Sequence, residues 1–264
     1  MRNRPTAECR LCLETKLLCD NHLLPAGAYR PLMTPGPKGV EPPVHIGVNH
    51  RKPLKSSRQI KDYLLCEGCE DRLRRQGEGW MTANGYHADG SFPLRDAALK
   101  KSTSFRGEDG TFIYETTGNP AIKMDQLVYF CMSVFWRAAA HTWKLGKDTI
   151  HLELGPYREP LRLFLLNEGS LPDELCLIVR MASVGYFGRT LVLPISEKHG
   201  AFRGHHFTAC GTSASLYVGK MIPEYFLLQS AFPKGILTFN KHFDNKQLGL
   251  VVEHVKENYA HLIK

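Results

Sequence analysis

The clearest periodic pattern in the chain is an apolar stripe between residues 124 and 143. Apolar side chains recur there at the spacing i, i+3, i+4, i+7 and i+8 of one helix face, and they are Leu127, Phe130, Cys131, Val134, Phe135 and Ala138. The same stretch also contains Asp125, Gln126, Arg137 and His141. Because four polar groups would be costly in hydrocarbon, the pattern predicts a core helix and not a membrane span.

Shorter apolar runs follow this helix and are bounded by glycine and proline. Runs at 161–166, 175–181 and 190–193 predict helix or strand segments, and strands are predicted at 207–210, 215–221 and 235–239. The final stretch, Lys246–Ile263, predicts an amphipathic helix whose apolar face comprises Leu248, Val251, Val252, Val255 and Tyr259. Residues 121–264 are therefore expected to form a mixed α/β domain.

The N-terminal part has a different pattern. Seven prolines between residues 25 and 56 exclude a long helix, because proline removes a donor and clashes with the preceding turn. We expect an irregular segment there, with at most a short strand at 44–48. A strand is predicted at 60–65 and the first turns of a helix at 71–75. Residues 76–120, rich in glycine, threonine, serine and charge, are expected to form loops and short strands.

The basic charge of the chain is concentrated near its start. Residues 1–75 hold 14 Lys and Arg against 8 Asp and Glu, whereas residues 76–264 hold 20 against 18. A run without an intervening acid comprises Arg51, Lys52, Lys55, Arg58 and Lys61. Such a run suits a polyanion, and we predict that it contacts nucleic acid, DNA in preference to RNA. A solvated loop that aids solubility is the alternative for the run alone.

Two Cys-x-x-Cys pairs, Cys9–Cys12 and Cys66–Cys69, give the strongest chemical signal. Two residues between cysteines let a tight turn present both thiolates to one ion, and two such turns complete the tetrahedral site of structural zinc. The long gap between the pairs is acceptable because loop-closure entropy grows slowly with loop length. We predict that zinc joins the pairs and supplies much of the folding free energy of this segment.

The other cysteines are expected to be free thiols. Cys19 lies outside the two-residue frame, and Cys131, Cys176 and Cys210 stand in apolar surroundings typical of core positions. No apolar stretch follows the first two arginines, so a secretory signal is not expected. We therefore predict a cytoplasmic protein, since thiols in that reducing compartment stay available as metal ligands.

The residues around the cysteine pairs resemble the zinc-bearing HNH endonucleases. The string Asp20-Asn21-His22-Leu23-Leu24-Pro25 follows the first pair, and Leu64-Leu65-Cys66-Glu67-Gly68-Cys69-Glu70 contains the second. The family pattern is a cysteine pair, an Asp-His-apolar-apolar-Pro string and a closing Leu-Cys-x-x-Cys-His. The chain is more similar still to degenerate bacterial HNH-like proteins that end in Cys-Glu and continue into a helix with a Trp-Arg pair, here Trp136-Arg137.

The resemblance implies an α+β fold with a small zinc-stabilised, treble-clef-like ββα-metal module at 1–80. A loop-rich connector at 81–120 and the larger mixed α/β domain at 121–264 would follow. His22 would be the general base that activates water against a DNA phosphodiester. Asn21 and Glu70 would hold a magnesium or manganese ion that stabilises the phosphorane and the leaving oxygen.

Several positions leave alternatives open. His22 could instead be a zinc ligand or a structural hydrogen-bonding residue. The family's central asparagine has no counterpart between residues 57 and 62, where Gln59 or Asp62 could serve instead. Glu70 could cap the following helix as well as hold a metal ion. Arg137 and His141 could form a second site, but a buried arginine paired with a carboxylate and a satisfied histidine is the commoner arrangement.

Three functions are compatible with these patterns. The leading one is an HNH-like nuclease, a class at home in bacterial phage defence. The second is a catalytically inactive zinc-finger protein that binds nucleic acid. The third is an assembly subunit whose C-terminal domain contacts a protein partner or a second copy. No membrane association is expected, and His205 and His206 are predicted to lie in a glycine-rich surface turn.

Overall fold

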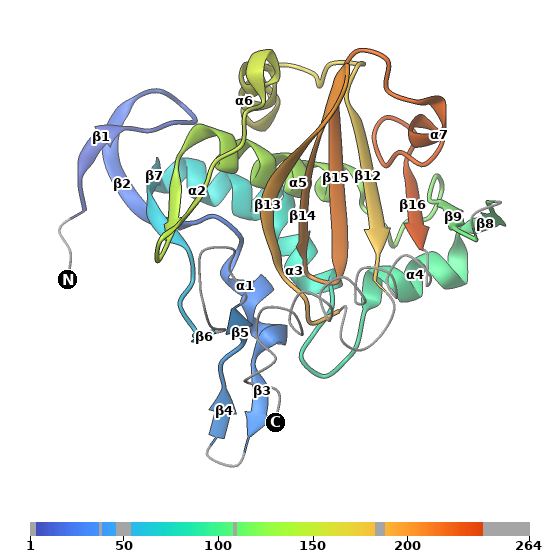
Figure 1. The fold of residues 1–264 in the computed structure, drawn as a ribbon, viewed down its shortest axis with the longest axis horizontal. Coiled ribbons are helices and arrows are strands. Elements are labelled where there is room, and N and C mark those ends of the chain that lie inside the picture. Colours follow the sequence, from blue (N-terminus) through green and yellow to red (C-terminus); the bar gives the residue numbers. More distant parts are fainter. Residues whose placement is uncertain (1–3, 37–38, 46–53, 108–109, 183–187, 240–264) are drawn as a thin grey trace.

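The structure is a computed structural model, and it describes residues 4–36, 39–45, 54–107, 110–182 and 188–239. The described part combines helices with a large mixed sheet and several smaller sheets (Figure 1). The chain is thus an α+β protein, as expected. The predicted closing helix at 246–263 lies outside the described residues.

A seven-stranded sheet forms most of the C-terminal part, in the order β13-β14-β15-β12-β16-β9-β8. All its neighbours are antiparallel except β12 and β16, which pair in parallel. The strands are β8 (Thr103–Arg106), β9 (Phe112–Glu115), β12 (Cys176–Met181), β13 (Val192–His199), β14 (Phe202–Ala209), β15 (Thr212–Gly219) and β16 (Ile236–Phe239). The strands predicted in this region are confirmed, with longer bounds for β13, β14 and β15.

Helix α5 (Met124–Ala140) packs against one face of this sheet (Figure 1). The ring of Phe207 on β14 meets the rings of Phe130 and Phe135 edge-on, with centroids 6.0 and 5.0 Å apart. The predicted helix is confirmed, but it ends at Ala140. Trp143 instead begins β10 (Trp143–Leu145), which pairs with β11 (Asp148–Ile150).

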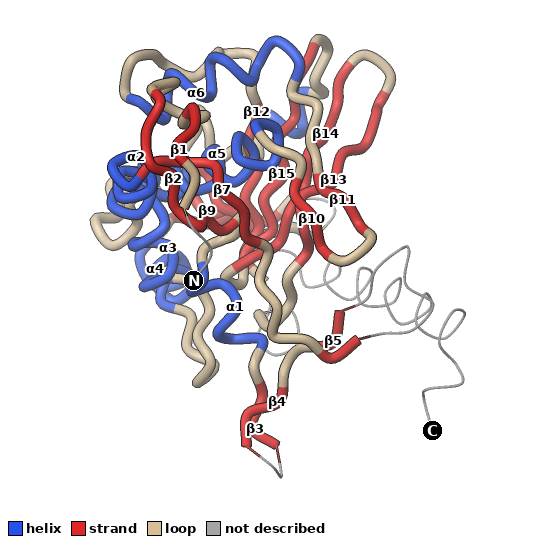
Figure 2. Tube along the Cα trace, turned by 90° about the vertical axis from the view of Figure 1, so that its left-hand side faces the viewer, coloured by secondary structure: helices blue, strands red, loops and turns tan. Residues whose placement is uncertain are grey.

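The N-terminal part forms a three-stranded antiparallel sheet in the order β1-β2-β7. Its strands are β1 (Thr6–Glu8), β2 (Thr15–His22) and β7 (Lys61–Cys66), and α2 (Glu67–Leu73) follows β7 directly. A pairing irregularity between Leu18 and Asp20 lets Leu18 and Asn21, three residues apart, both point inward. The region between β2 and β7 contains two small hairpins, of which β3–β4 extends away from the body of the molecule (Figure 2).

The remaining short elements complete the fold. Between β2 and β7 lie α1 (Ala26–Tyr29), η1 (Arg30–Leu32), β3 (Thr34–Gly36), β4 (Gly39–Glu41), β5 (Val44–His45) and β6 (Leu54–Lys55). Farther along are η3 (Gly155–Tyr157), α6 (Arg158–Leu166) and α7 (Glu224–Leu227). No helix in the described ranges has both the length and the apolar character that a membrane crossing requires.

The prediction of loops between residues 76 and 101 is wrong. Helix α2 continues through the π-helical turn η2 (Arg74–Glu78) into α3 (Gly79–Asn84), and α4 (Pro93–Lys101) follows. Glycine is needed here for close packing and not for a loop, since a Cβ on Gly77 would lie 2.7 Å from the backbone nitrogen of Phe130. The turn therefore presses directly against α5.

One continuous cluster of buried apolar side chains joins the two parts of the molecule. It includes Leu11, Leu23 and Leu65 from the N-terminal sheet region together with Phe130 and Trp136 from α5. Polar contacts add to it, because Arg162 on α6 donates a hydrogen bond of 2.7 Å to the carbonyl of Leu11. The N-terminal sheet is thus packed against α5 and α6, and a domain boundary at residue 80 stays a prediction.

Candidate functional site

The four cysteines of the two Cys-x-x-Cys pairs come together in one cluster. Their sulfur atoms all lie within 4.8 Å of one another, and those of Cys12 and Cys66 are 4.0 Å apart. Four thiolates about 2.3 Å from a shared zinc ion would be separated by about 3.8 Å. The donor set and its spacing therefore fit a metal ion and are consistent with structural zinc.

Local backbone geometry places each pair. Cys9 and Cys12 sit in the turn between β1 and β2, where Leu13 takes a left-handed conformation (φ 62°) and donates to the carbonyl of Cys9 at 2.8 Å. Cys66 ends β7 and Cys69 lies in the first turn of α2. The backbone N–H of Cys66 donates to the sulfur of Cys9 at 3.4 Å. A hydrogen bond from the Cys69 thiol lowers the pKa of Cys9, which favours the thiolate at Cys9.

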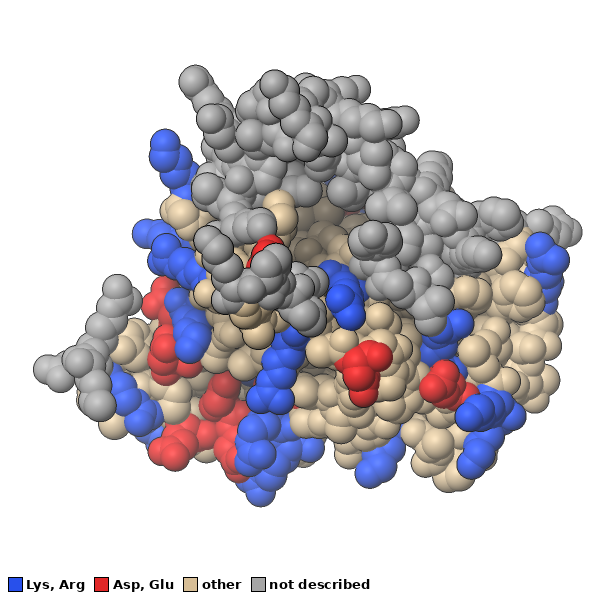
Figure 3. Space-filling view, turned by 90° about the horizontal axis from the view of Figure 1, so that it is seen from below, with Lys and Arg blue, Asp and Glu red and all other residues tan. Residues whose placement is uncertain are grey.

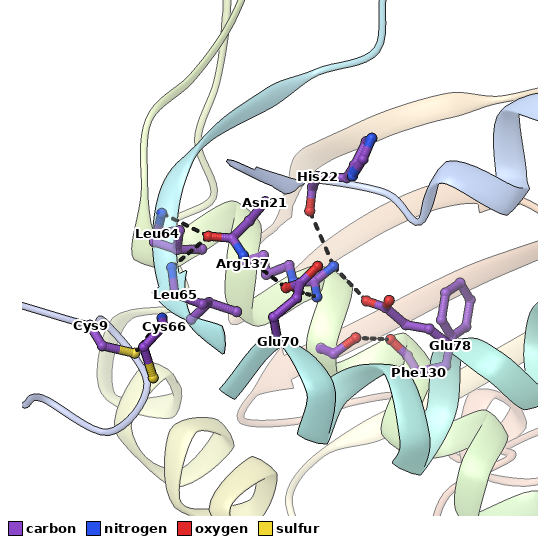
Figure 4. Close-up of polar contacts among 11 residues, drawn as sticks. Cys9, Asn21, His22, Leu64, Leu65, Cys66, Glu70, Glu78, Phe130 and Arg137 are labelled. Carbon is purple, nitrogen blue, oxygen red and sulfur yellow. Dashed lines mark hydrogen bonds and ion pairs between the residues drawn. The ribbon is translucent and has the colours of Figure 1, made fainter. Parts of the chain in front are cut away.

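Asn21 connects the three elements of the N-terminal region (Figure 4). Its side-chain oxygen accepts hydrogen bonds from the backbone N–H groups of Leu64 and Leu65, at 2.9 and 2.6 Å. Its side-chain nitrogen donates to Glu70 at 3.0 Å. Asn21 is fully buried, and both lone pairs of its amide oxygen are engaged. In this arrangement Asn21 ties β2 to β7 and α2, and its oxygen is not free to bind a metal ion.

The guanidinium of Arg137 lies beside Glu70 and faces the backbone carbonyl of His22 (Figure 4). Its Nη2 is 3.3 Å from Glu70 Oε2, and its Nη1 donates to the carbonyl of His22 at 3.1 Å. The same Nη1 lies 2.6 Å from Glu78 Oε1 on η2. Arg137 is completely buried, so the expected buried arginine paired with carboxylates is confirmed. The expected satisfied histidine is confirmed too, since His141 Nε2 lies 2.8 Å from Asp62 Oδ2.

Glu78 is the site residue that the sequence patterns did not indicate. Burial raises the pKa of its carboxyl group, and the adjacent Arg137 opposes this shift. Glu78 stands between two glycines, a context that predicts a loop. Only its position on a helical turn facing α5 brings it to Arg137.

His22 is the last residue of β2 and is only partly exposed. Its Nε2 lies 2.6 Å from the side-chain oxygen of Gln59. Burial, and then the charge of Lys61, lower the pKa of His22, which favours the neutral imidazole at pH 7. Of the two candidates for the missing asparagine, Gln59 is the residue that contacts His22, whereas Asp62 pairs with His141.

Gln59 also lines a surface concavity of about 830 Å³ beside the sheet. Arg58 and Lys61 line it with Asp20, Asp62 and Glu67, and Lys61 lies 3.5 Å from Asp20. Seen from below, the described surface also shows Lys and Arg interspersed with Asp and Glu (Figure 3). The concavity is thus not uniformly basic.

The rest of the predicted basic run is described only in part. Arg51 and Lys52 lie outside the described residues, and Lys55 belongs to the short strand β6. Glu70, the predicted divalent-metal ligand after the second cysteine pair, is 30% exposed and lines a second hollow of about 400 Å³. The structure thus joins Asn21 to Glu70 directly, and links His22 to Glu70 only through its backbone carbonyl and Arg137. The nucleic-acid contacts stay a prediction.

Comparisons with known proteins found no matching family model, no similar curated protein and no similar solved structure.

Proposed function

We propose that residues 1–80 form a zinc-bound, HNH-like ββα module that acts on DNA, with His22 as the general base of phosphodiester hydrolysis. Strands β2 and β7 pair antiparallel, and α2 follows β7 directly. His22 stands at the end of β2. The cysteine cluster fits the zinc of such a module. The proposal includes a reducing cytoplasmic location, where the thiolates stay available, and a phage-defence setting suggested by the resemblance alone.

The contact between His22 and Gln59 is the observation on which hydrolysis depends. A glutamine side-chain oxygen only accepts hydrogen bonds, so Nε2 of His22 is the protonated nitrogen. The lone pair of the neutral imidazole is then on Nδ1. Because the pKa of His22 is lowered, this nitrogen can accept a proton from an attacking water at neutral pH. Gln59 would fix the tautomer and orient the ring.

The two predicted ligands do not suit a divalent ion as a pair. Glu70 presents a carboxylate, which is the donor a hard cation prefers, but its Oε2 already faces the guanidinium of Arg137 and the amide of Asn21. The oxygen of Asn21 is engaged by two backbone N–H groups. We therefore assign no step of the reaction to a second metal ion.

A DNA-binding module without hydrolysis is the second candidate, and Arg137 favours it. The guanidinium already provides a buried positive charge beside Glu70. A metal ion at Glu70 would have to compete with that charge. Under this alternative, the mixed-charge concavity and the basic run would contact the phosphate backbone, and the binding would weaken steeply as salt is raised.

Cleavage assays with the full chain separate the two candidates. Plasmid and single-stranded DNA would be incubated with the protein in magnesium, in manganese and in excess chelator, beside His22→Ala, Gln59→Leu and the control His151→Ala, which removes an exposed histidine far along the chain. We expect His22→Ala to reduce cleavage at least about 100-fold, the usual contribution of a general base, with a smaller loss for Gln59→Leu and none for the control.

Each other outcome has a definite meaning. Cleavage that survives in His22→Ala would contradict the role of His22. Salt-sensitive binding without cleavage would establish the second candidate. Absence of both, together with a stable oligomer in solution, would instead favour the assembly role and overturn the proposal.

A further inference from the structure

Three side chains of the types that bind metal ions share one face of the seven-stranded sheet, far along the chain from the cysteine cluster. Glu197 and His199 lie two residues apart on β13, and His206 lies on β14. In the register of this antiparallel pair, Ile195 stands opposite His206 and Glu197 opposite Gly204. Because alternate residues of a strand share a face and directly paired residues point the same way, all three side chains project from the face opposite α5.

The ligand atoms of these residues are gathered closely. His199 Nε2 lies 3.5 Å and His206 Nε2 4.0 Å from Glu197 Oε2, and all three atoms lie within 4.8 Å of one another. Nitrogen and oxygen ligands about 2.1 Å from one tetrahedral ion stand about 3.4 Å apart. Glu197 and His199 are both exposed, so small rotations of these two side chains are enough to reach that spacing.

An unsatisfied nitrogen gives independent evidence for a ligand. His206 Nε2 is buried, and within the described part of the chain it has no hydrogen-bond partner. The opposite ring nitrogen, Nδ1, lies 2.9 Å from the hydroxyl of Ser215 on β15. This pairing fixes the ring and directs Nε2 toward Glu197. A histidine held through one nitrogen by a polar partner, with the other nitrogen free, is the usual state of a metal ligand.

The surroundings leave room for the imidazole ring of His206. A Cβ on Gly204 would lie 2.7 Å from His206 Nε2, so glycine at this position makes the space. The His199 ring stacks on Phe202, with centroids 5.2 Å apart.

We propose that Glu197, His199 and His206 form a second metal site that binds Zn²⁺ or a similar borderline divalent transition metal. Two imidazoles and one carboxylate are the ligand set of sites that keep a fourth position for water. The positive charge of Arg180 acts on His206, so binding is expected to be weaker than at the four thiolates. The site does not depend on the function proposed for residues 1–80.

Metal counting on the full chain tests the site. The protein would be dialysed to equilibrium against buffered Zn²⁺, and bound zinc would be measured per chain. We expect two equivalents for the wild-type protein and for the control His151→Gln, and one for the double variant Glu197→Gln/His199→Gln. Ser215→Ala, which removes the partner of His206, should weaken the second equivalent by about 10–100-fold.

Cobalt substitution shows which site is filled. The first equivalent of Co²⁺ should give the intense thiolate charge-transfer band of the cysteine cluster, and this band must persist in the double variant as evidence that the protein is folded. The second equivalent should add only weak visible bands. One equivalent in the wild-type protein, or a second equivalent that survives in the double variant, would overturn the proposal.

Discussion

The N-terminal sheet β1-β2-β7 and the seven-stranded sheet differ in what holds them. The four cysteine sulfurs and the buried amide of Asn21 connect β2, β7 and α2. In the larger sheet, apolar contacts such as those of Phe207 with Phe130 and Phe135 hold β14 against α5. Both regions share one apolar cluster, whose many contacts are individually weak. The first region adds to it a few strong polar contacts and the thiolate cluster.

The joint between the regions lies at the candidate site. Arg137 belongs to α5 and packs with the second region, but its guanidinium contacts the carbonyl of His22 and the carboxylate of Glu70 in the first. The position of His22 therefore depends on a helix whose apolar periodicity indicates only a core element. The candidate site in the N-terminal region is therefore held in place by α5, which belongs to the region with the larger core.

Loss of the thiolate cluster should produce the largest effect. Structural zinc contributes about 10 kcal/mol or more to the folding of small zinc modules, so chelation of the metal, or Cys69→Ser, should unfold the region around β1, β2 and α2. Hydrogen exchange would show protection lost there while β12, β14 and β15 remain protected. The control Cys19→Ser removes a thiol outside the cluster. Equal loss of protection in both regions would show that they unfold as one unit and would remove the distinction drawn between them.

Replacement of Arg137 should cause the second-largest loss of stability. Arg137→Met leaves Glu78 buried without its positive partner, and breaking a buried ion pair costs about 3–5 kcal/mol. Urea unfolding would measure this loss. The double variant Glu78→Leu/Arg137→Met removes the stranded carboxylate and should recover at least half of the loss. If stability did not recover, the loss in Arg137→Met would come mainly from the contacts with His22 and Glu70 and not from the ion pair with Glu78.

The features of the fold and of the candidate site that the sequence predicts correctly are those that depend on residues close together in the chain. A Cys-x-x-Cys turn is local, and so is the repeat of Leu127 and Val134 on one helix face, and both were predicted correctly. The partner of His22 is not local. Gln59 lies two residues before β7 and Asp62 lies within it. The register that pairs His22 with Lys61 decides which of the two contacts the ring.

Two of the predictions from sequence were wrong because long-range contacts outweighed local sequence preferences. The glycines around Glu78 predict a loop, but one of them, Gly77, serves close packing of η2 against α5. His205 and His206 were expected in a surface turn, yet both lie within β14, and His205 is fully buried. In each case a long-range contact overrides the local preference of glycine for turns, and nothing within a short window of sequence indicates that contact.

Truncation of a buried side chain in the seven-stranded sheet tests the difference between the two regions from the side of the larger core. Phe207→Ala should cost about 3 kcal/mol, because removal of a buried phenyl ring leaves a cavity between β14 and α5. We expect this loss in urea unfolding with the metal content of the cysteine cluster unchanged. If the metal were released together with the lost stability, the N-terminal sheet would require an intact α5 contact to keep its cysteines assembled.

Asn21→Ala should have the smallest of these effects and act only within the N-terminal region. It leaves the backbone N–H groups of Leu64 and Leu65 without their acceptor, and Glu70 without one donor. Unsatisfied buried donors cost about 1–3 kcal/mol, so we expect a loss of about 2 kcal/mol in urea unfolding. Asn21→Asp keeps the acceptor but places a second carboxylate beside Glu70, and it should be no more stable than Asn21→Ala. A more stable Asn21→Asp variant, above all one stabilised further by magnesium, would instead show that two carboxylates recreate a divalent-metal site there, and that asparagine at position 21 is what now prevents it.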